Sequence, residues 1–173
     1  DIPVIADCAE ALGALLKEFK SRKGKKPDLK PWKQEIDIWR ARNCFAYTNS
    51  ESVIKPQYAV QRLYELTRDR DTYITTEVGQ HQMWAAQFYH FDEPNRWMTS
   101  GGLGTMGYGL PAAVGVQAAH PGALVIDIAG EASIQMMMQE LSTAVQHKLP
   151  VKVFILNNEW MGMVRQWQEL LHG

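Results

Sequence analysis

Apolar and polar positions divide the chain into three parts. The apolar stretch Ile2–Ala6 predicts a short strand, and apolar residues spaced three and four apart then predict an amphipathic helix that ends near Phe19. Because residues 1–20 are too few to enclose a core, we interpret them as the tail of a preceding central domain. Residues 21–54 combine a Lys-Gly-Lys-Lys-Pro run with a polar stretch that contains tryptophans, and predict a linker with at most one short helix.

Residues 55–173 alternate between the periodicities of strands and helices. The predicted strands span 72–78, 124–129 and 151–156, and a short stretch at 96–99 precedes a glycine-rich segment. The predicted helices begin at Pro56 and after Gly79 and cover 110–119, 134–146 and 161–171. This alternation predicts an α/β fold: a doubly wound parallel sheet with helices on both faces. Since the chain begins without methionine and stops soon after its last strand, we expect a fragment whose domain is truncated at the C-terminus.

Composition argues against several classes of function. With a net charge of −1 over 173 residues and no basic stripe interleaved with aromatics, the chain has no sequence signal for nucleic acid. Its apolar runs are shorter than the roughly 18 residues that a membrane helix needs. Cys8 and Cys44 are too few for a disulfide framework and have no partners at metal-ligand spacing. Together with the lack of a signal-peptide pattern, this predicts a cytoplasmic protein, or one of the plastid or mitochondrion if the source is eukaryotic.

Oxygen-bearing side chains follow two of the predicted strands. The sequence Gly-Glu-Ala-Ser at 130–133 comes directly after one strand, and Asn157 and Asn158 come directly after the next. Ligands of open parallel sheets bind outside the carboxyl ends of the strands, where all these residues fall. Carboxylate and amide oxygens suit Mg²⁺, and backbone amides at a helix start suit a diphosphate. The pair of motifs therefore predicts a site for Mg²⁺ and a phosphorylated cofactor.

A simpler interpretation stays open for each of these residues alone. Glu131 can be an acid favoured at the start of a helix, Ser133 a cap of its first turn, and the two asparagines a turn after a strand. Their shared place at one sheet edge favours the site.

A second motif competes with this interpretation. Gly102-Leu-Gly104-Thr-Met-Gly107 matches the dinucleotide-binding fingerprint, and Asp127 lies where that fingerprint places its ribose-binding acid. We disfavour nicotinamide or flavin binding here for two reasons. The stretch before the glycines is short and polar, and Asp127 falls inside a predicted strand rather than at its carboxyl end.

Longer segments carry a resemblance to a known family. The block from Gly130 to Asn158 resembles the thiamine-diphosphate motif, which begins Gly-Asp-Gly or Gly-Asp-Ala and ends Asn-Asn. Three segments are similar to the catalytic large subunit of acetolactate (acetohydroxyacid) synthase: Glu-Val-Gly-Gln-His-Gln-Met-Trp at 77–84, Thr-Ser-Gly-Gly-Leu-Gly-Thr-Met-Gly-Tyr-Gly at 99–109, and Leu-Asn-Asn-Glu-Trp-Met-Gly-Met-Val-Arg-Gln-Trp at 156–167. The similarity implies a thiamine-diphosphate-binding fold for residues 55–173.

The resemblance also implies a role for each matching position. Mg²⁺ is expected on the carboxylate of Glu131, the side chain of Asn158 and the backbone carbonyl of Trp160. Met106 is expected beneath the two rings of the cofactor, where it enforces a folded shape, with an ordinary core methionine as the plainer alternative. The other cofactor-binding positions are expected to be Gln80, His81, Gly104, Gly130, Ala132, Ser133, Asn158, Gly162 and Met163. Val164 and Trp167, on one face of the last helix, are expected to line the substrate channel, although Trp167 can also be a core residue.

The activity that the resemblance implies is the condensation of pyruvate with a second 2-oxo acid, either pyruvate or 2-oxobutyrate, with loss of CO₂. This reaction is the first common step of branched-chain amino-acid biosynthesis. Thiamine diphosphate and Mg²⁺ are its expected cofactors, while FAD is expected in the full-length parent and not in this chain. The glutamate that activates the cofactor belongs to the family's N-terminal domain and acts across a dimer interface. We therefore expect a homodimer or higher homo-oligomer, a regulatory small subunit as in this family, and no activity from this chain alone.

One position departs from the family pattern. Glu131 stands where the family has Asp, and Mg²⁺ demands near-ideal octahedral geometry at about 2.0–2.1 Å, so a changed rotamer or backbone has to absorb the added methylene. We expect weaker Mg²⁺ binding than with Asp. Two other interpretations stay open: a different thiamine-dependent decarboxylase or carboligase, and a non-catalytic cofactor-binding module in which Glu131 marks lost catalysis.

Overall fold

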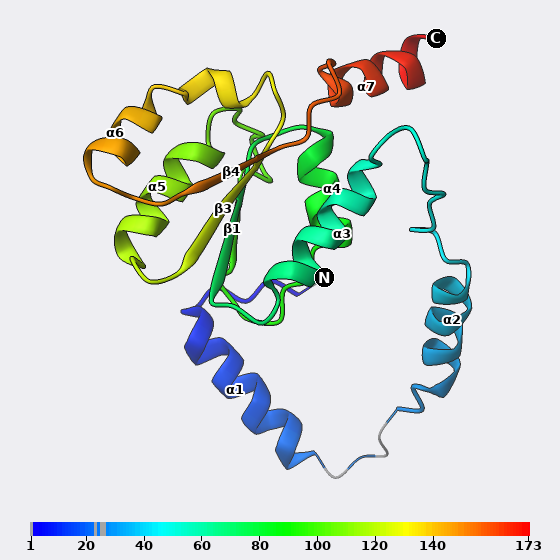
Figure 1. The fold of residues 1–173 in the computed structure, drawn as a ribbon. Helices are drawn as coiled ribbons and strands as arrows, with labels where there is room; N and C mark the ends of the chain where they lie inside the picture. Colours follow the sequence, from blue (N-terminus) through cyan, green and yellow to red (C-terminus); the bar gives the residue numbers. More distant parts are fainter. Residues whose placement is uncertain (1, 23, 25–26) are drawn as a thin grey trace. The chain divides into compact units, whose positions relative to one another are not determined.

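The computed structural model describes residues 2–22, 24 and 27–173 (Figure 1). The first residue of the predicted tail and the lysines at 23, 25 and 26 of the predicted linker lie outside the described residues. The chain divides into two compact units, residues 1–46 and 47–173. The predicted boundaries at 20 and 54 stay predictions.

The first unit consists of two helices, α1 (Cys8–Ser21) and α2 (Lys30–Ala41). Asp7 caps α1, because its side chain accepts hydrogen bonds from the backbone N–H groups of Ala9 and Glu10 at 3.0 and 3.1 Å. None of the described residues of either helix is buried. The strand predicted at 2–6 is wrong: these residues pair with no strand in the described chain, and an isolated strand leaves its backbone hydrogen-bonding groups unpaired.

The second unit is built on a four-stranded sheet with the order β2-β1-β3-β4. The strands are β1 (Thr72–Thr76), β2 (Trp97–Thr99), β3 (Leu124–Ala129) and β4 (Lys152–Ile155). All three pairs of neighbouring strands are parallel. The predicted parallel sheet is confirmed.

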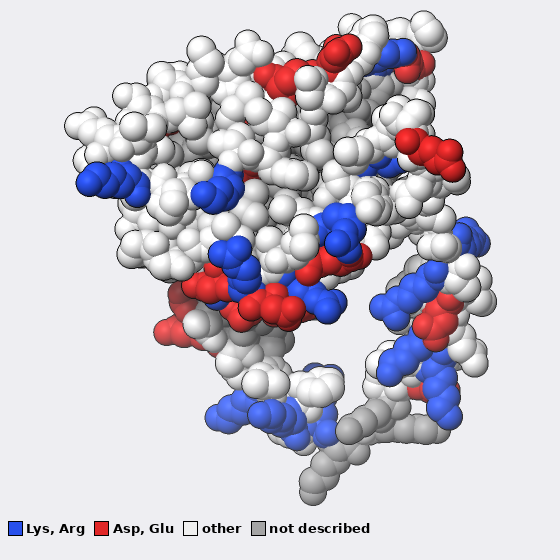
Figure 2. All heavy atoms as spheres, viewed as in Figure 1, with Lys and Arg blue, Asp and Glu red and all other residues white. Residues whose placement is uncertain are grey.

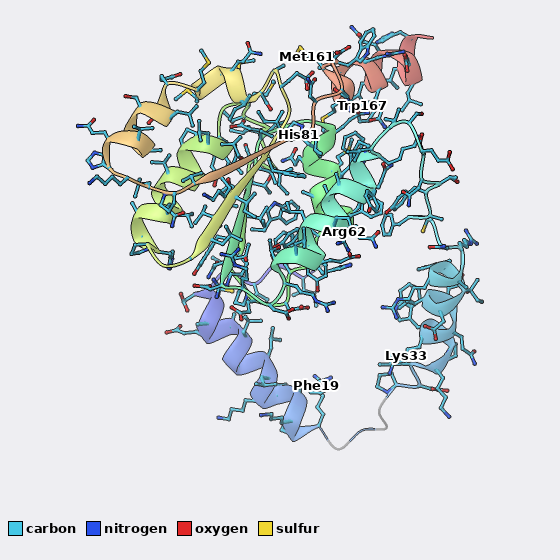
Figure 3. The ribbon with its side chains drawn as sticks, in the orientation of Figure 1. Phe19, Lys33, Arg62, His81, Met161 and Trp167 are labelled. Carbon is cyan, nitrogen blue, oxygen red and sulfur yellow. The ribbon has the colours of Figure 1, made fainter. Side chains whose placement is uncertain are left out.

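Helices cover both faces of this sheet (Figures 1 and 3). On one face, α3 (Pro56–Thr67) and α4 (Gln80–Phe88) enclose a core made of Val60, Ile74, Ala85, Tyr89, Ile126 and Ile128. On the other face, α5 (Gly109–Ala119) and α6 (Glu140–Gln146) enclose a core made of Leu110, Val114, Ala129, Ile134 and Ala144. Successive strand residues alternate between the two cores, so the doubly wound prediction is confirmed as well.

Two segments differ from a plain alternation of strands and helices. The helix predicted over 134–146 is interrupted: a 3₁₀ turn (Ile134–Met137) precedes α6, with Ile134 in the core and Met137 against Gly107. The last helix, α7 (Gly162–His172), agrees with the prediction from the sequence. None of its residues is buried. No helix in the described part of the chain is long and apolar enough to cross a membrane.

Charged side chains of both signs gather at the end of the second unit where β1 and β2 begin (Figure 2). Arg96 lies between two acids there, 2.5 Å from Asp71 and 2.6 Å from Glu93, with its guanidinium over the ring of Tyr73. The carboxyl ends of the strands lie at the opposite edge of the sheet.

Asp127 is a buried acid in the middle of β3. Thr75, its register partner on β1, donates a hydrogen bond from Oγ1 to Asp127 Oδ1 at 3.1 Å, while Oδ2 has no partner among the described residues. Burial, and then the nearby Glu77 carboxylate, raise the pKa of Asp127 to about 7. An acid enclosed in this way cannot reach a ribose, so the dinucleotide fingerprint lacks its acidic partner.

This raised pKa gives a prediction for stability. Asp127 holds its proton more tightly in the folded chain than in the unfolded chain, so its contribution to stability is greatest below pH 4 and is lost as the pH rises towards 7. The amide of Asp127→Asn does not titrate, so the variant does not lose this stability as the pH rises. We expect the free energy of urea unfolding of the variant, relative to the wild type, to rise by about 3 kcal/mol between pH 5 and pH 8. Asp92→Asn, at an exposed acid, is the control, and a relative stability of Asp127→Asn that does not change with pH contradicts the account.

Candidate functional site

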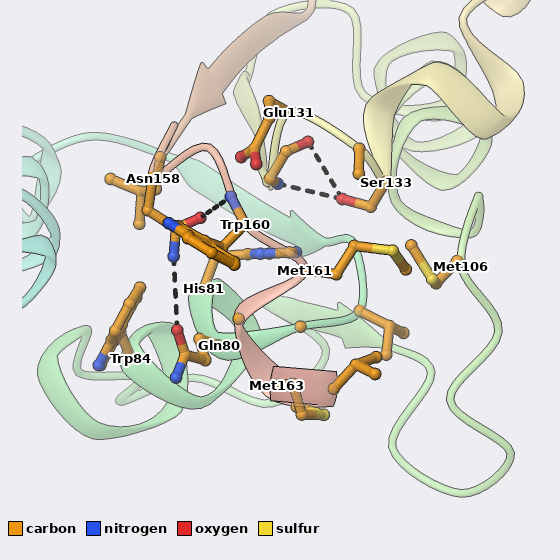
Figure 4. Close-up of a pocket in the computed structure, with 17 residues that line it drawn as sticks. Gln80, His81, Trp84, Met106, Glu131, Ser133, Asn158, Trp160, Met161 and Met163 are labelled. Atoms are coloured by element: carbon orange, nitrogen blue, oxygen red, sulfur yellow. Dashed lines mark hydrogen bonds between the residues drawn. The ribbon is translucent and has the colours of Figure 1, made fainter. Parts of the chain in front are cut away.

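Three turns meet at the carboxyl ends of β1, β3 and β4, because these strands are parallel neighbours. Together with the start of α7 they form a pocket of about 520 Å³, open solvent at its mouth included (Figure 4). The pocket is lined by Val78, Gly79, Gln80, His81, Trp84, Met106, Gly130, Glu131, Ala132, Ser133, Leu156, Asn158, Trp160, Met161, Gly162, Met163 and Val164.

His81 lies at the base of this pocket, in the first turn of α4. Burial lowers the pKa of His81 to about 4, opposed by a hydrogen bond to the backbone of Glu77, so the ring is neutral near pH 7. Its Nε2 atom is buried and has no partner among the described residues. A buried polar atom without a partner costs free energy.

Hydrogen bonds between side-chain amides connect the turn after β1, the turn after β4 and helix α7. Asn158 Nδ2 donates to Gln80 Oε1 at 3.4 Å, and Gln80 Nε2 donates to Gln166 Oε1 on α7 at 3.1 Å. Asn158 Oδ1 accepts from the backbone N–H of Trp160 at 3.2 Å, which orients the amide. The side chain of Asn157 instead closes a turn with the N–H of Glu159 and does not line the pocket.

Gly162 lies where the start of α7 approaches the side-chain amides of Gln80 and Asn158. A Cβ atom at this position would overlap Gln80 Oε1 and lie 3.0 Å from Asn158 Nδ2. The absence of a side chain therefore lets the helix start approach these amides closely.

The turn after β3 presents Glu131 to the pocket. Ser133 Oγ accepts from the N–H of Gly130 at 3.1 Å and lies 3.2 Å from its carbonyl oxygen, which fixes the turn. Glu131 is half-buried and, among the described residues that line the pocket, is the only one with a formally charged side chain; none of them is a lysine or arginine. No group of three or more His, Cys, Asp and Glu in the described chain is placed to hold a metal ion, so a metal here has to use amide or backbone oxygens as well.

Most of the residues predicted from the sequence line this pocket. These are Gln80, His81, Met106, Gly130, Glu131, Ala132, Ser133, Asn158, Trp160, Gly162, Met163 and Val164. Gly104 and Trp167 do not line it. The side chain of Trp167 is 58% exposed on α7 (Figure 3), so the alternative interpretation as a core residue is wrong in the described chain.

Five further residues line the pocket without having been predicted from the sequence: Val78, Gly79, Trp84, Leu156 and Met161. Trp84 could have been found, because it lies four residues after Gln80 on α4 and therefore on the same face of the helix. Val78, Leu156 and Met161 are apolar residues next to predicted site residues and carry no chemical signal of their own.

Comparison with known proteins identifies the family of this pocket. A family model described as "Thiamine pyrophosphate enzyme, C-terminal TPP binding domain" matches residues 77–173. The chain belongs to this family of thiamine pyrophosphate enzymes. The matched residues include every element that lines the pocket, so the predicted thiamine-diphosphate-binding fold is confirmed.

Individual relatives are acetolactate synthase large subunits, in agreement with the predicted resemblance. The isozyme 3 large subunit of Escherichia coli (strain K12) is 48% identical over 175 residues, which cover 100% of this chain and 30% of that protein. The large subunit of Haemophilus influenzae is 47% identical, covering 99% of this chain and 30% of the relative, and that of Porphyra purpurea is 44% identical, covering 99% and 29%. The chain thus spans about 30% of the length of these relatives.

The contact at Gly162 gives a prediction for binding. In Gly162→Ala the added methyl displaces the end of the flexible Gln80 side chain, so the fold is retained but the hydrogen-bonded amides shift. We expect the affinity of the chain for thiamine diphosphate with Mg²⁺ to fall about tenfold, measured by quenching of tryptophan fluorescence. The matched control is Gly115→Ala in α5, where a Cβ meets nothing within 4 Å. Equal affinities of the two variants would falsify this role of Gly162.

Proposed function

We propose that this chain supplies the diphosphate- and metal-binding half of an acetolactate synthase active site. The observation that carries the proposal is the pocket at the ends of β1, β3 and β4, whose described lining has one carboxylate, two side-chain amides and no cationic side chain. Relatives named acetolactate synthase, aligned over the whole chain, support the reaction.

Charge is the argument for Mg²⁺. A diphosphate is an anion, and Glu131 adds a further negative charge in a pocket whose described lining offers no lysine or arginine to offset it. A divalent cation between Glu131 and the diphosphate removes this repulsion. The donor set fits Mg²⁺, which prefers oxygen: the carboxylate of Glu131, Oδ1 of Asn158 and the backbone carbonyl of Trp160.

The remaining polar groups suit the diphosphate itself. Gln80 and His81 come from the turn after β1, and both residues line the pocket. Ala132, Ser133, Gly162 and Met163 bring further backbone groups to the same space.

Apolar residues form the rest of the pocket. Trp84, Met106 and Val164 are suited to exclude water and to hold the rings of the cofactor in one orientation. When bound, thiamine diphosphate supplies the electron sink for cleavage next to the carbonyl of a 2-oxo acid. Met106 supports the folded shape of the cofactor, and Val164 and Trp167 face the substrate channel.

The whole enzyme is proposed to need parts beyond this chain, which spans about 30% of its relatives. These parts include the activating glutamate of an N-terminal domain, a second subunit and the FAD site. Pyruvate and 2-oxobutyrate are the proposed substrates. Residues 1–20 are then the end of the central domain, and residues 21–54 are the linker. The exposed apolar side chains of α1, at Leu12, Leu15, Leu16 and Phe19, suit helix packing against such a domain.

Acetolactate formation is expected only when the chain is combined with the rest of the enzyme. The chain alone is expected to consume no pyruvate, because the activating glutamate is missing. A chimaera in which the chain replaces the matching segment of the Escherichia coli large subunit is expected to form acetolactate when thiamine diphosphate and Mg²⁺ are supplied. Product formation is measured by a colorimetric assay for acetolactate.

The control is the same chimaera with Glu131→Ala, which keeps the fold and loses the metal carboxylate. Pyruvate consumption by the chain alone contradicts the proposal. A folded, oligomeric chimaera that binds the cofactor and forms no acetolactate contradicts it too.

A further inference from the structure

Glu77 is a fully buried acid that the proposed chemistry does not use. It follows β1 directly, and its N–H donates to the carbonyl of Ile128 at 3.0 Å, which extends the pairing of β1 with β3 by one residue. Alternation along the strand places its side chain on the same face as Thr75, towards α5. The carboxylate is therefore held by the sheet at a fixed position beneath the loop 100–109.

The two oxygens of this carboxylate bind two separate parts of the chain. Oε2 accepts a hydrogen bond from the N–H of Gly107 at 2.6 Å, and Oε1 accepts one from the N–H of Leu110 at 3.0 Å. Gly107 belongs to the loop, and Leu110 to the first turn of α5, where backbone N–H groups have no partner inside the helix. A carboxylate is favoured there by the helix dipole, and hydrogen bonds to a charged acceptor are stronger than neutral ones.

Close packing at Gly109 holds the start of α5 against the end of β1. A Cβ atom at this position would overlap Asp127 Oδ1 and lie 2.7 Å from both the N atom of Glu77 and the carbonyl carbon of Thr76. The start of α5 therefore rests directly on the backbone at the end of β1. In this position the N–H groups of Gly107 and Leu110 reach the Glu77 carboxylate.

Met106 is the residue next to the Glu77 contact. It lines the pocket, whereas the other end of the loop is exposed, with Leu103 97% exposed. Gly107 has a φ of 89°, a left-handed conformation that glycine adopts readily. We infer that Glu77 is a positioning residue: by binding the N–H groups of Gly107 and Leu110, it fixes the loop 100–109 and places Met106 against the rings of the cofactor. This inference rests on the proposed function.

The test compares the wild-type chain with Glu77→Gln, in which one oxygen becomes an NH₂ donor that faces a backbone donor. Hydrogen exchange at single amides measures the loop, and calorimetry with Mg²⁺ present measures the affinity for thiamine diphosphate and for inorganic diphosphate. We expect exchange at Gly107 and Leu110 to rise about tenfold and exchange at Ile126 to stay unchanged. Thiamine diphosphate is expected to bind about tenfold more weakly, and inorganic diphosphate, which does not reach Met106, to bind equally well.

Three further variants make the result specific. Met106→Ala should weaken thiamine diphosphate binding without changing exchange at Gly107, and Glu51→Gln, at an exposed acid, should change neither. If Glu77→Gln does not fold, Glu77→Asp serves instead, because its carboxylate is one methylene too short to reach both amides.

Unchanged exchange at Gly107, or an equal loss of affinity for both ligands, overturns the inference. A folded wild-type chain that binds neither ligand overturns the proposed function and the link to the cofactor. The exchange measurement then still decides whether Glu77 holds the loop.

Discussion

Parallel pairing of β1, β3 and β4 is the constraint on which the pocket depends. It brings the turns after all three strands to one edge of the sheet, although Gln80, Glu131 and Asn158 are far apart in the sequence. Helix cores on both faces hold the sheet, and direct backbone contact at Gly109 seats α5 on it. The site residues themselves contribute little to this support, because most of them lie in turns. Ligand chemistry can therefore vary in these turns while the sheet stays constant.

Most of the second unit could be predicted from the sequence, because β3 and β4 lie in mostly apolar runs and its helices follow turn residues. The run at 124–129 has the same bounds in the structure as in the prediction. Errors arose where local pattern was a weak guide. Ile2–Ala6 is apolar but has no neighbouring strand in the described chain, and residues 134–146 have helical spacing that the 3₁₀ turn beside Gly107 interrupts.

The residue types of the site could be predicted from the sequence, but which of them line the pocket could be predicted less well. Motif residues such as His81 and Asn158 line the pocket, because the motif sets both residue type and strand end. Trp167 shares a helix face with Val164 yet lies outside the lining, since spacing along a helix does not show how far that helix covers a pocket. The contact of Glu77 with the loop could not be predicted from the sequence, because its partners are backbone N–H groups thirty or more residues away.

We propose that this pocket, whose described lining has no cationic side chain, accepts a diphosphate only together with a divalent metal. Calorimetric titration of thiamine diphosphate into this chain, with Mg²⁺ and with a chelator, tests it most directly. The account predicts binding with Mg²⁺ that weakens at least about a hundredfold in the chelator, and a lower half-saturating Mg²⁺ concentration for Glu131→Asp, whose shorter acid matches the family pattern. Equal affinity for thiamine diphosphate with and without the metal would contradict the account.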